Sequence, residues 1–158
     1  MKSLWNMFLQ SVQLPKKQAA FTLNRIGMDA TVFYIFIILF IASIPTYIEQ
    51  LRENEQLSTF FFSIFFFIFH YLPVVIIVFV ALSLLAWFGS LIATMAKRKL
   101  RFSILWKMTA SATTIPLLLF TLISFFYKLH TIYLIISIGF ILFIVTKIIF
   151  LYPQRRNT

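Results

Sequence analysis

Acidic residues and cysteine are what this sequence lacks. It has four Asp and Glu in 158 residues, only three glycines, and no cysteine. The absence of cysteine excludes disulfides, thiolate metal sites and cysteine nucleophiles. The sequence has no Walker-type loop and no nucleophile elbow, and no paired carboxylates lie deep within an apolar run. We therefore predict a protein that is not an enzyme and binds no cofactor.

Charged residues of either sign are also few. They make up 11% of the chain, whereas 61% is hydrophobic and 19% aromatic. A soluble domain of this size needs more charge to cover its surface, so lipid is the expected solvent. The formal net charge of +10 comes from short basic clusters beside apolar runs, which favours anionic lipid headgroups at the cytoplasmic face over nucleic acid as the partner. The predicted fold class is all-α, a polytopic helical bundle in a membrane.

The apolar runs predict a single membrane domain over residues 1–158. Runs of about 18 residues or more are long enough to cross the hydrocarbon core as helices. Residues 1–30 lack the short basic leader and the small-residue cleavage site of a signal peptide, and we expect them to form a cytoplasmic interfacial segment. The four expected spans are residues 31–48, 73–96, 103–127 and 131–152.

A Phe-rich segment, residues 59–72, lies between the first two spans and is too short to cross alone. The apolar run that contains it continues to residue 96 and would reach about 57 Å as one straight helix, nearly twice the hydrocarbon thickness. Because Pro73 divides the run, we expect residues 59–72 to form a half helix on the outer side, with a bend near His70–Pro73. The half helix is interfacial, re-entrant or an extension of the second span, and the sequence leaves these three placements open.

The basic residues predict which side of the membrane each connecting segment faces. They gather in the N-terminal segment, in residues 97–101 and at Arg155 and Arg156, whereas residues 49–55 hold three of the four acids. Positive residues favour the cytoplasmic side of a membrane. Four spans put all three basic segments on that side, and five would expose residues 97–101 or reverse the N-terminus. We expect a membrane protein with both termini in the cytoplasm.

The N-terminal segment has a helical pattern of its own. Its apolar residues recur at near-helical spacing, and Pro15 followed by two lysines is typical of the start of a second helix. Two interpretations stay open, an anchor on the cytoplasmic leaflet and a cuff packed against the bundle, and both place the helix at the membrane interface. The apolar residues are Leu4, Trp5, Phe8, Leu9 and Val12.

The third span carries small and hydroxylated residues directly before Pro116. Small residues let helices approach closely, and hydroxyls satisfy backbone groups that a proline frees. We expect this span to be the central helix, packed against small residues of the second span. The alternative is a kink that lines a polar path. The expected seam consists of Gly89, Ser90, Ala93, Ala110, Ser111, Thr113, Thr114 and Pro116.

Ionisable side chains near the inner ends of the spans are functional candidates, because charge is costly within a membrane. Lys107 and Lys147 each lie about one turn from an end, and we expect both to snorkel to headgroups. Asp29 is a candidate partner for Lys107. Arg25, four residues before Asp29, is the more local partner for that carboxylate and is preferred.

On the outer side, Phe61, Phe65, His70 and Pro73 are candidates for contact with lipid or with a partner subunit, and lipid contact alone is preferred. His70 and His130 fall near the same face as three glutamates. Their spacing matches no metal-binding motif, so no metal site is expected.

Residues 8–45 and 98–120 carry a loose pattern. Its features are Phe8, Ser11, Pro15, Phe21, Ile26, Gly27, Tyr34 and Pro45 in the first segment, and Trp106, Lys107, Thr109, Ala110 and Pro116 in the second. With these features the chain resembles a Gram-positive bacterial membrane family of unknown function. Some of its members are named maltodextrin-utilisation proteins, and the family is distantly similar to Yip-type proteins of membrane trafficking. The resemblance implies an extracellular domain after the first span, where this chain has only a short loop, and it implies no catalytic residues.

Taken as a whole, the sequence favours a protein that works by contacts. We expect a non-enzymatic accessory or scaffold subunit, or a modulator of a membrane transporter or envelope complex. Its expected partners are the lipid bilayer, anionic headgroups, and either another membrane protein or a second copy of the chain. The alternative is a small transporter, channel or lipid-handling protein, which would need a polar lumen that only residues 109–114 offer.

Overall fold

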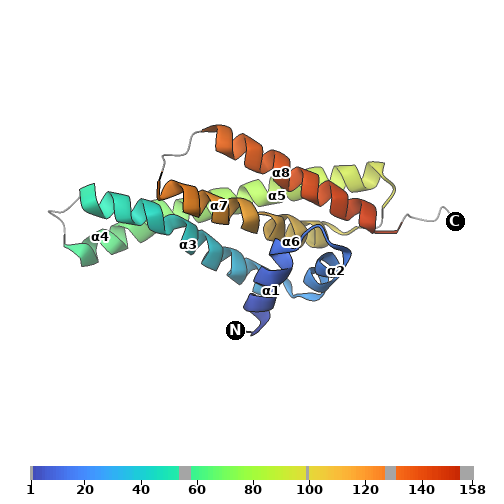
Figure 1. The fold of residues 1–158 in the computed structure, drawn as a ribbon, viewed down its shortest axis with the longest axis horizontal. Helices are drawn as coiled ribbons and strands as arrows, with labels where there is room; N and C mark the ends of the chain where they lie inside the picture. Colours follow the sequence, from blue (N-terminus) through green and yellow to red (C-terminus); the bar gives the residue numbers. More distant parts are fainter. Residues whose placement is uncertain (1, 54–57, 99, 127–130, 154–158) are drawn as a thin grey trace.

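The computed structural model describes residues 2–53, 58–98, 100–126 and 131–153, and the regular elements in these ranges are helices. Figure 1 shows an elongated bundle in which α3, α5, α7 and α8 follow the long axis, while α1 lies across it. Four helical stretches of the described chain are long and apolar enough to cross a membrane. The predicted four-span bundle of a membrane protein is therefore confirmed.

The first span is α3 (Met28–Glu53), which is longer than the predicted residues 31–48. Asp29 lies in its first turn, where a negative charge is favourable against the helix dipole. One face of the helix is buried against the bundle and the other is exposed, because α3 lies at the edge of the bundle. The buried residues are Thr31, Tyr34, Ile35, Ile38, Leu39, Ala42 and Pro45.

The second span belongs to a continuous helical stretch of 37 residues, Thr59–Met95. It consists of α4 (Thr59–Phe66), the π-helical segment η1 (Phe67–Tyr71) and α5 (Leu72–Met95). Residues 59–72 are helical, as predicted, and of the three placements left open the structure has the extension of the second span. Instead of ending at Pro73, the helix widens into η1, because a π-turn takes up the hydrogen bond and the space that a proline disrupts.

The third span is divided into α6 (Phe102–Ala112) and α7 (Thr114–Ser124). Pro116 explains the division, because it cannot donate to the carbonyl four residues earlier and its ring crowds that carbonyl. The hydroxyls of Thr109 and Thr113 donate to the backbone oxygens of Leu105 and Thr109, each at 2.8 Å. These hydroxyls are therefore used within their own helix.

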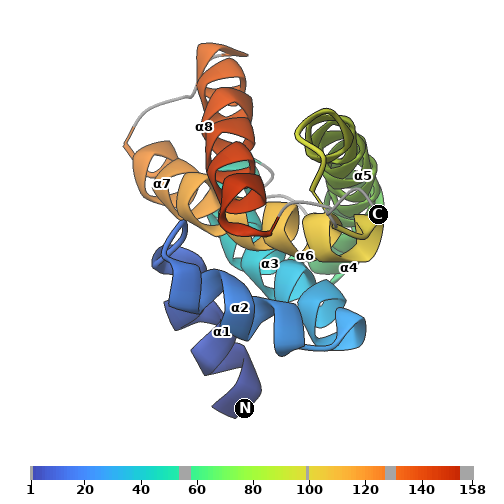
Figure 2. The same cartoon turned by 90° about the vertical axis from the view of Figure 1, so that its right-hand side faces the viewer.

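α6 lies at the centre of the bundle. Its residues from Leu105 to Ala112 are all buried, and it contacts α1, α2, α3, α5 and α8. Figure 2, which looks along the bundle, shows α6 between the N-terminal helices on one side and α5 and α8 on the other. The fourth span, α8 (Thr131–Leu151), completes the bundle and packs on α5 and α6.

The N-terminal segment forms α1 (Lys2–Val12) and α2 (Lys17–Arg25), which confirms two helices there. Of the two arrangements left open, the structure has the cuff, because α1 contacts α3, α6 and α7, and α2 contacts α6 and α8. The predicted apolar stripe is only partly buried: Leu4 and Phe8 pack against the bundle, whereas Trp5, Leu9 and Val12 are exposed. The bundle covers Met7, Ser11 and Leu14, whereas Trp5 is 62% exposed.

Candidate functional site

The two ends of the bundle differ in charge. One end, formed by α2 and the C-terminal ends of α5 and α8, is called the basic end (Figure 1). The opposite end, where α3 leads to α4, is called the Phe-rich end, and the C-terminal end of α3 there carries Glu49, Arg52 and Glu53. Cations at the surface of the basic end include Lys16, Lys17, Arg25, Lys97, Arg98 and Arg101.

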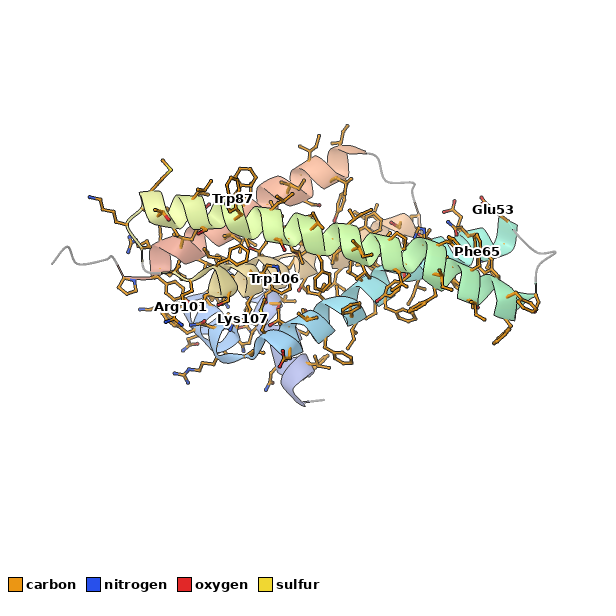
Figure 3. The ribbon with its side chains drawn as sticks, turned by 180° about the vertical axis from the view of Figure 1, so that it is seen from behind. Glu53, Phe65, Trp87, Arg101, Trp106 and Lys107 are labelled. Atoms are coloured by element: carbon orange, nitrogen blue, oxygen red, sulfur yellow. The ribbon has the colours of Figure 1, made fainter. Side chains whose placement is uncertain are left out.

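Lys107 is buried at the basic end, only 9% exposed. Its amine donates to the backbone oxygens of Asn24 at 2.6 Å and Ile26 at 2.8 Å. Figure 3 shows Lys107 in the region where α6 meets the α2–α3 connection. The prediction that this lysine extends to lipid headgroups is wrong, because its amine is bound by two backbone carbonyls of its own chain.

Asp29 lies apart from this contact. It is exposed, and within the described ranges it forms no ion pair with Lys107 or with Arg25. The preferred pairing of Arg25 with Asp29 assumed one continuous helix. The backbone is extended at Ile26, with ψ of 139°, so α2 ends before α3 begins and residues four apart no longer share a face.

A polar hollow opens between α1 and α2, with a volume of about 490 Å³. Three glutamines, a threonine, a phenylalanine and two cations surround it, and none of its lining residues is acidic. The lining residues are Gln10, Gln13, Lys17, Gln18, Phe21, Thr22 and Arg25. Phe21 also contacts the ring of Tyr152 at 5.2 Å between centroids, which ties α2 to the end of α8.

The connection after α5 is fastened to the end of α8. The guanidinium of Arg98 donates to the backbone oxygen of Tyr152 and lies 5.6 Å from the ring centroid of Phe150. On α8, Lys147 is exposed and lies 4.9 Å from the ring centroid of Phe143.

The predicted seam residues are buried, except Ser90, which is half-buried. A Cβ on Gly89 would lie 3.1 Å from Val145 and 3.7 Å from Leu105. Gly89 therefore faces α8 and the first turns of α6, and not the run at 109–114. Thr114, at the end of that run, meets α3 through a hydrogen bond of 2.9 Å between its hydroxyl and that of Tyr34.

The Phe-rich end has two aromatic faces. On the inner face, the ring of Tyr47 packs on Phe62 and Phe66, with centroids 5.6 and 5.1 Å apart, and its hydroxyl lies 2.9 Å from that of Ser63. His70 is half-buried and stacks on Phe66, while Pro73 is exposed. The outer face is bare: Phe60, Phe61, Phe65 and Phe69 are each 60 to 69% exposed.

An apolar groove of about 650 Å³ runs along the side of the bundle, over α5 and between α3 and the start of α6. Its only polar lining residue is Ser83, whose hydroxyl accepts a hydrogen bond of 3.2 Å from the indole of Trp106. The other lining residues are Phe36, Val75, Ile76, Phe79, Val80, Leu84, Trp87 and Phe102.

A family described as "Protein of unknown function (DUF1189)" has a model that matches residues 47–153. The chain belongs to the DUF1189 family. Membership confirms that part of the resemblance which pointed to an uncharacterised family, and the Gram-positive, maltodextrin and Yip parts stay expectations. No curated protein and no solved structure matches the chain.

The DUF1189 match divides the candidate sites. Lys107, the seam and the Phe-rich end lie within the matched residues 47–153. The hollow between α1 and α2 lies outside the matched residues. Residues 8–45, the first segment of the resemblance, also lie outside them. Glu55 and His130 lie outside the described residues.

Sequence reasoning missed the hollow and the Tyr34–Thr114 contact in this DUF1189 protein. The spacing of Lys17, Phe21 and Arg25 at intervals of four was an available signal, because it places all three on one face of a helix. Nothing comparable marked Tyr34, since its partner is 80 residues away in the chain.

Proposed function

We propose that this DUF1189 chain is a non-enzymatic accessory or scaffold subunit that binds another helical membrane protein through its Phe-rich end. The bacterial cytoplasmic membrane is its proposed location, with both termini in the cytoplasm. The observation that carries the proposal is the length of the second helical stretch.

That stretch is longer than a membrane is thick. Its 37 residues correspond to about 55 Å at 1.5 Å per residue. At an average tilt of roughly 20° it would still rise about 52 Å, more than the roughly 40–45 Å of a bilayer with its headgroups. In Figure 1 the α3–α4 hairpin extends beyond the ends of α7 and α8, while α5 also reaches past α1 and the start of α3 at the basic end. Part of the excess is therefore proposed to lie at the Phe-rich end.

The protruding part is apolar on its free face. Phe61 and Phe65 are 69% and 60% exposed, one helical turn apart, and the ring of Phe65 stacks on that of Phe69 at 4.6 Å. An apolar aromatic row that extends past the hydrocarbon would face water unless a partner covered it. Aromatic side chains are also the residues most enriched at protein interfaces.

The orientation is supported by the charges. Lys97, Arg98 and Arg101 follow α5 at the basic end, while two acids and one cation, Arg52, lie at the Phe-rich end of α3. Positive residues favour the cytoplasm. The basic end is therefore proposed to be cytoplasmic, which places the Phe-rich end outside.

The test replaces Phe61 and Phe65 with serine and compares purification in mild detergent with that of the unchanged chain. A matched control replaces Ile135 and Ile136 of α8, which are 67% and 62% exposed. We expect a stoichiometric membrane partner, or a second copy seen by light scattering, to be lost in the first variant and kept in the control. Equal behaviour of both variants, with normal membrane integration, would remove the Phe-rich end from any account of function.

A lipid-handling role is the second candidate, and the lateral apolar groove favours it. A groove within the roughly 300–1,000 Å³ range of small-molecule pockets, lined almost wholly by apolar residues, suits an acyl chain. Val80→Trp would fill it from α5, where Val80 is 56% exposed. Lipid exchange between vesicles that falls in this variant would favour the second candidate. Unchanged exchange would count against it.

A further inference from the structure

The hollow between α1 and α2 carries two positive charges and no negative one. Lys17 and Arg25 both line it, two helical turns apart on α2, and the amides of Gln10, Gln13 and Gln18 complete its polar wall. Within the described ranges neither cation forms an ion pair. A concave site with two free cations and several amide donors has the composition that recognises a phosphate group.

The backbone on both sides of Arg25 is fixed by hydrogen bonds from α6. The amine of Lys107 binds the carbonyl oxygens of Asn24 and Ile26, the residues on either side of Arg25. The opposite face of α2 is fixed by burial of Ala19, Ala20 and Leu23. The hollow therefore has a firm wall on the α2 side, which lowers the entropic cost of binding.

α1 has three distinct faces, and these set the depth of the hollow. One face packs on the bundle through Met7 and Ser11. A second, made of Trp5, Leu9 and Val12, is apolar and exposed. The third, with Gln10, lines the hollow together with Gln13, which follows α1.

A helix across the bundle axis with a bare apolar face beside a polar one is typical of the membrane interface. Tryptophan is enriched at this level, where its ring meets the headgroups. α1 lies across the long axis in Figure 1, so its apolar face can enter the lipid while its polar face stays at headgroup depth. With α1 at the membrane interface, the hollow would open at the depth of lipid phosphates.

We propose that the hollow between α1 and α2 binds the phosphate headgroup of one anionic phospholipid, with Lys17 and Arg25 contacting the phosphate oxygens and the three glutamines donating to the headgroup. This site is independent of the partner proposed for the Phe-rich end. A soluble phosphate ester would present the same chemistry, and the experiment separates the two sources.

The experiment counts bound lipids by native mass spectrometry on the full chain in detergent, titrated with phosphatidylglycerol or phosphatidylcholine. We expect one tightly bound phosphatidylglycerol and no comparable phosphatidylcholine. Replacing Lys17 and Arg25 with glutamine weakens this binding by about fivefold for each charge removed. The matched control, K97Q with R101Q, removes two exposed cations from the same end of the bundle and leaves the affinity within about twofold.

A second variant guards against a folding defect. Thr22 is exposed and lines the hollow, so Thr22→Glu adds a carboxylate there without removing either cation, and we expect it to abolish tight binding while thermal unfolding is unchanged. Equal loss in the hollow and control variants overturns the proposal in favour of diffuse attraction. Inorganic phosphate or glycerol 3-phosphate that binds as tightly as the lipid, and displaces it, overturns the lipid assignment.

Discussion

The amine of Lys107 lies 2.6 Å from the backbone oxygen of Asn24 and 2.8 Å from that of Ile26. These oxygens belong to the end of α2, where helix carbonyls have no partner within the helix. A cation at that position also complements the negative end of the helix dipole. A single side chain of the central helix thus fastens the N-terminal cuff to the bundle.

Replacing Lys107 with methionine should destabilise the protein. Methionine keeps most of the volume of the lysine stem but leaves two backbone oxygens without their donor. The expected cost is about 1–3 kcal/mol in the free energy of unfolding. Thermal unfolding in detergent micelles measures it.

Lys147→Met is the matched control, because Lys147 is exposed on α8 with its amine over the ring of Phe143. Exposed substitutions of this kind usually change stability by no more than about 0.5 kcal/mol. If both variants unfold at the temperature of the unchanged protein, the two hydrogen bonds of Lys107 contribute nothing to holding the cuff.

Lys107 also illustrates what the sequence can predict in a membrane protein. Its position one turn into the third span predicted its depth. Its partners could not be predicted, because they lie more than 80 residues earlier in a connection that folds back over α6. Helix number and placement follow from the length of apolar runs, whereas long-range contacts have no local signal.

α1 shows a second limit. Its helical period was visible, but its buried face is marked by Met7 and Ser11 and not by Trp5, Leu9 or Val12. In lipid, apolar side chains are as favourable on the surface as in the core, so hydrophobicity no longer separates the two. For the same reason, the apolar composition of residues 59–72 could not show whether this segment is a separate half helix or part of the second span.

The close packing of Gly89 gives a prediction with an internal comparison. Alanine is about 0.5–1 kcal/mol more favourable than glycine within a helix. At Gly139, where an added Cβ would meet nothing within 4 Å beyond its own stretch of helix, Gly139→Ala should stabilise the protein by about that amount. At Gly89 the added Cβ would lie 3.1 Å from a methyl group of Val145, so crowding offsets the gain.

The measurement is thermal unfolding of both alanine variants under the same conditions. We expect Gly139→Ala to unfold at a higher temperature than the unchanged protein, and Gly89→Ala to unfold at the same temperature or below it. An equal rise in both would show that Gly89 is not at a tight contact between α5 and α8.

The hydrogen bond between Tyr34 and Thr114 should couple α3 to the third span. The residues are buried, at 3% and 0% exposure, and their hydroxyls lie 2.9 Å apart. A double-mutant cycle with Tyr34→Phe and Thr114→Val isolates their interaction from the effect of each change alone. We expect a coupling energy of about 0.5–1.5 kcal/mol, the range of a hydrogen bond in folded proteins. If the destabilisation of the double variant equals the sum of the two single effects, the hydrogen bond does not stabilise the protein.

Topology is the prediction on which the direction of every proposed contact depends, and the chain is well suited to test it. Because the sequence contains no cysteine, a single introduced thiol can report the side on which it lies without background. Ser58→Cys at the Phe-rich end and Arg101→Cys at the basic end are both exposed positions in the structure. With the basic end in the cytoplasm, a membrane-impermeant maleimide added to intact cells should label Ser58→Cys and leave Arg101→Cys unlabelled until the cells are opened. Labelling of Arg101→Cys from outside would show that the orientation is the reverse of the one proposed. The Phe-rich end would then face cytoplasmic partners and the hollow between α1 and α2 would face the outer leaflet.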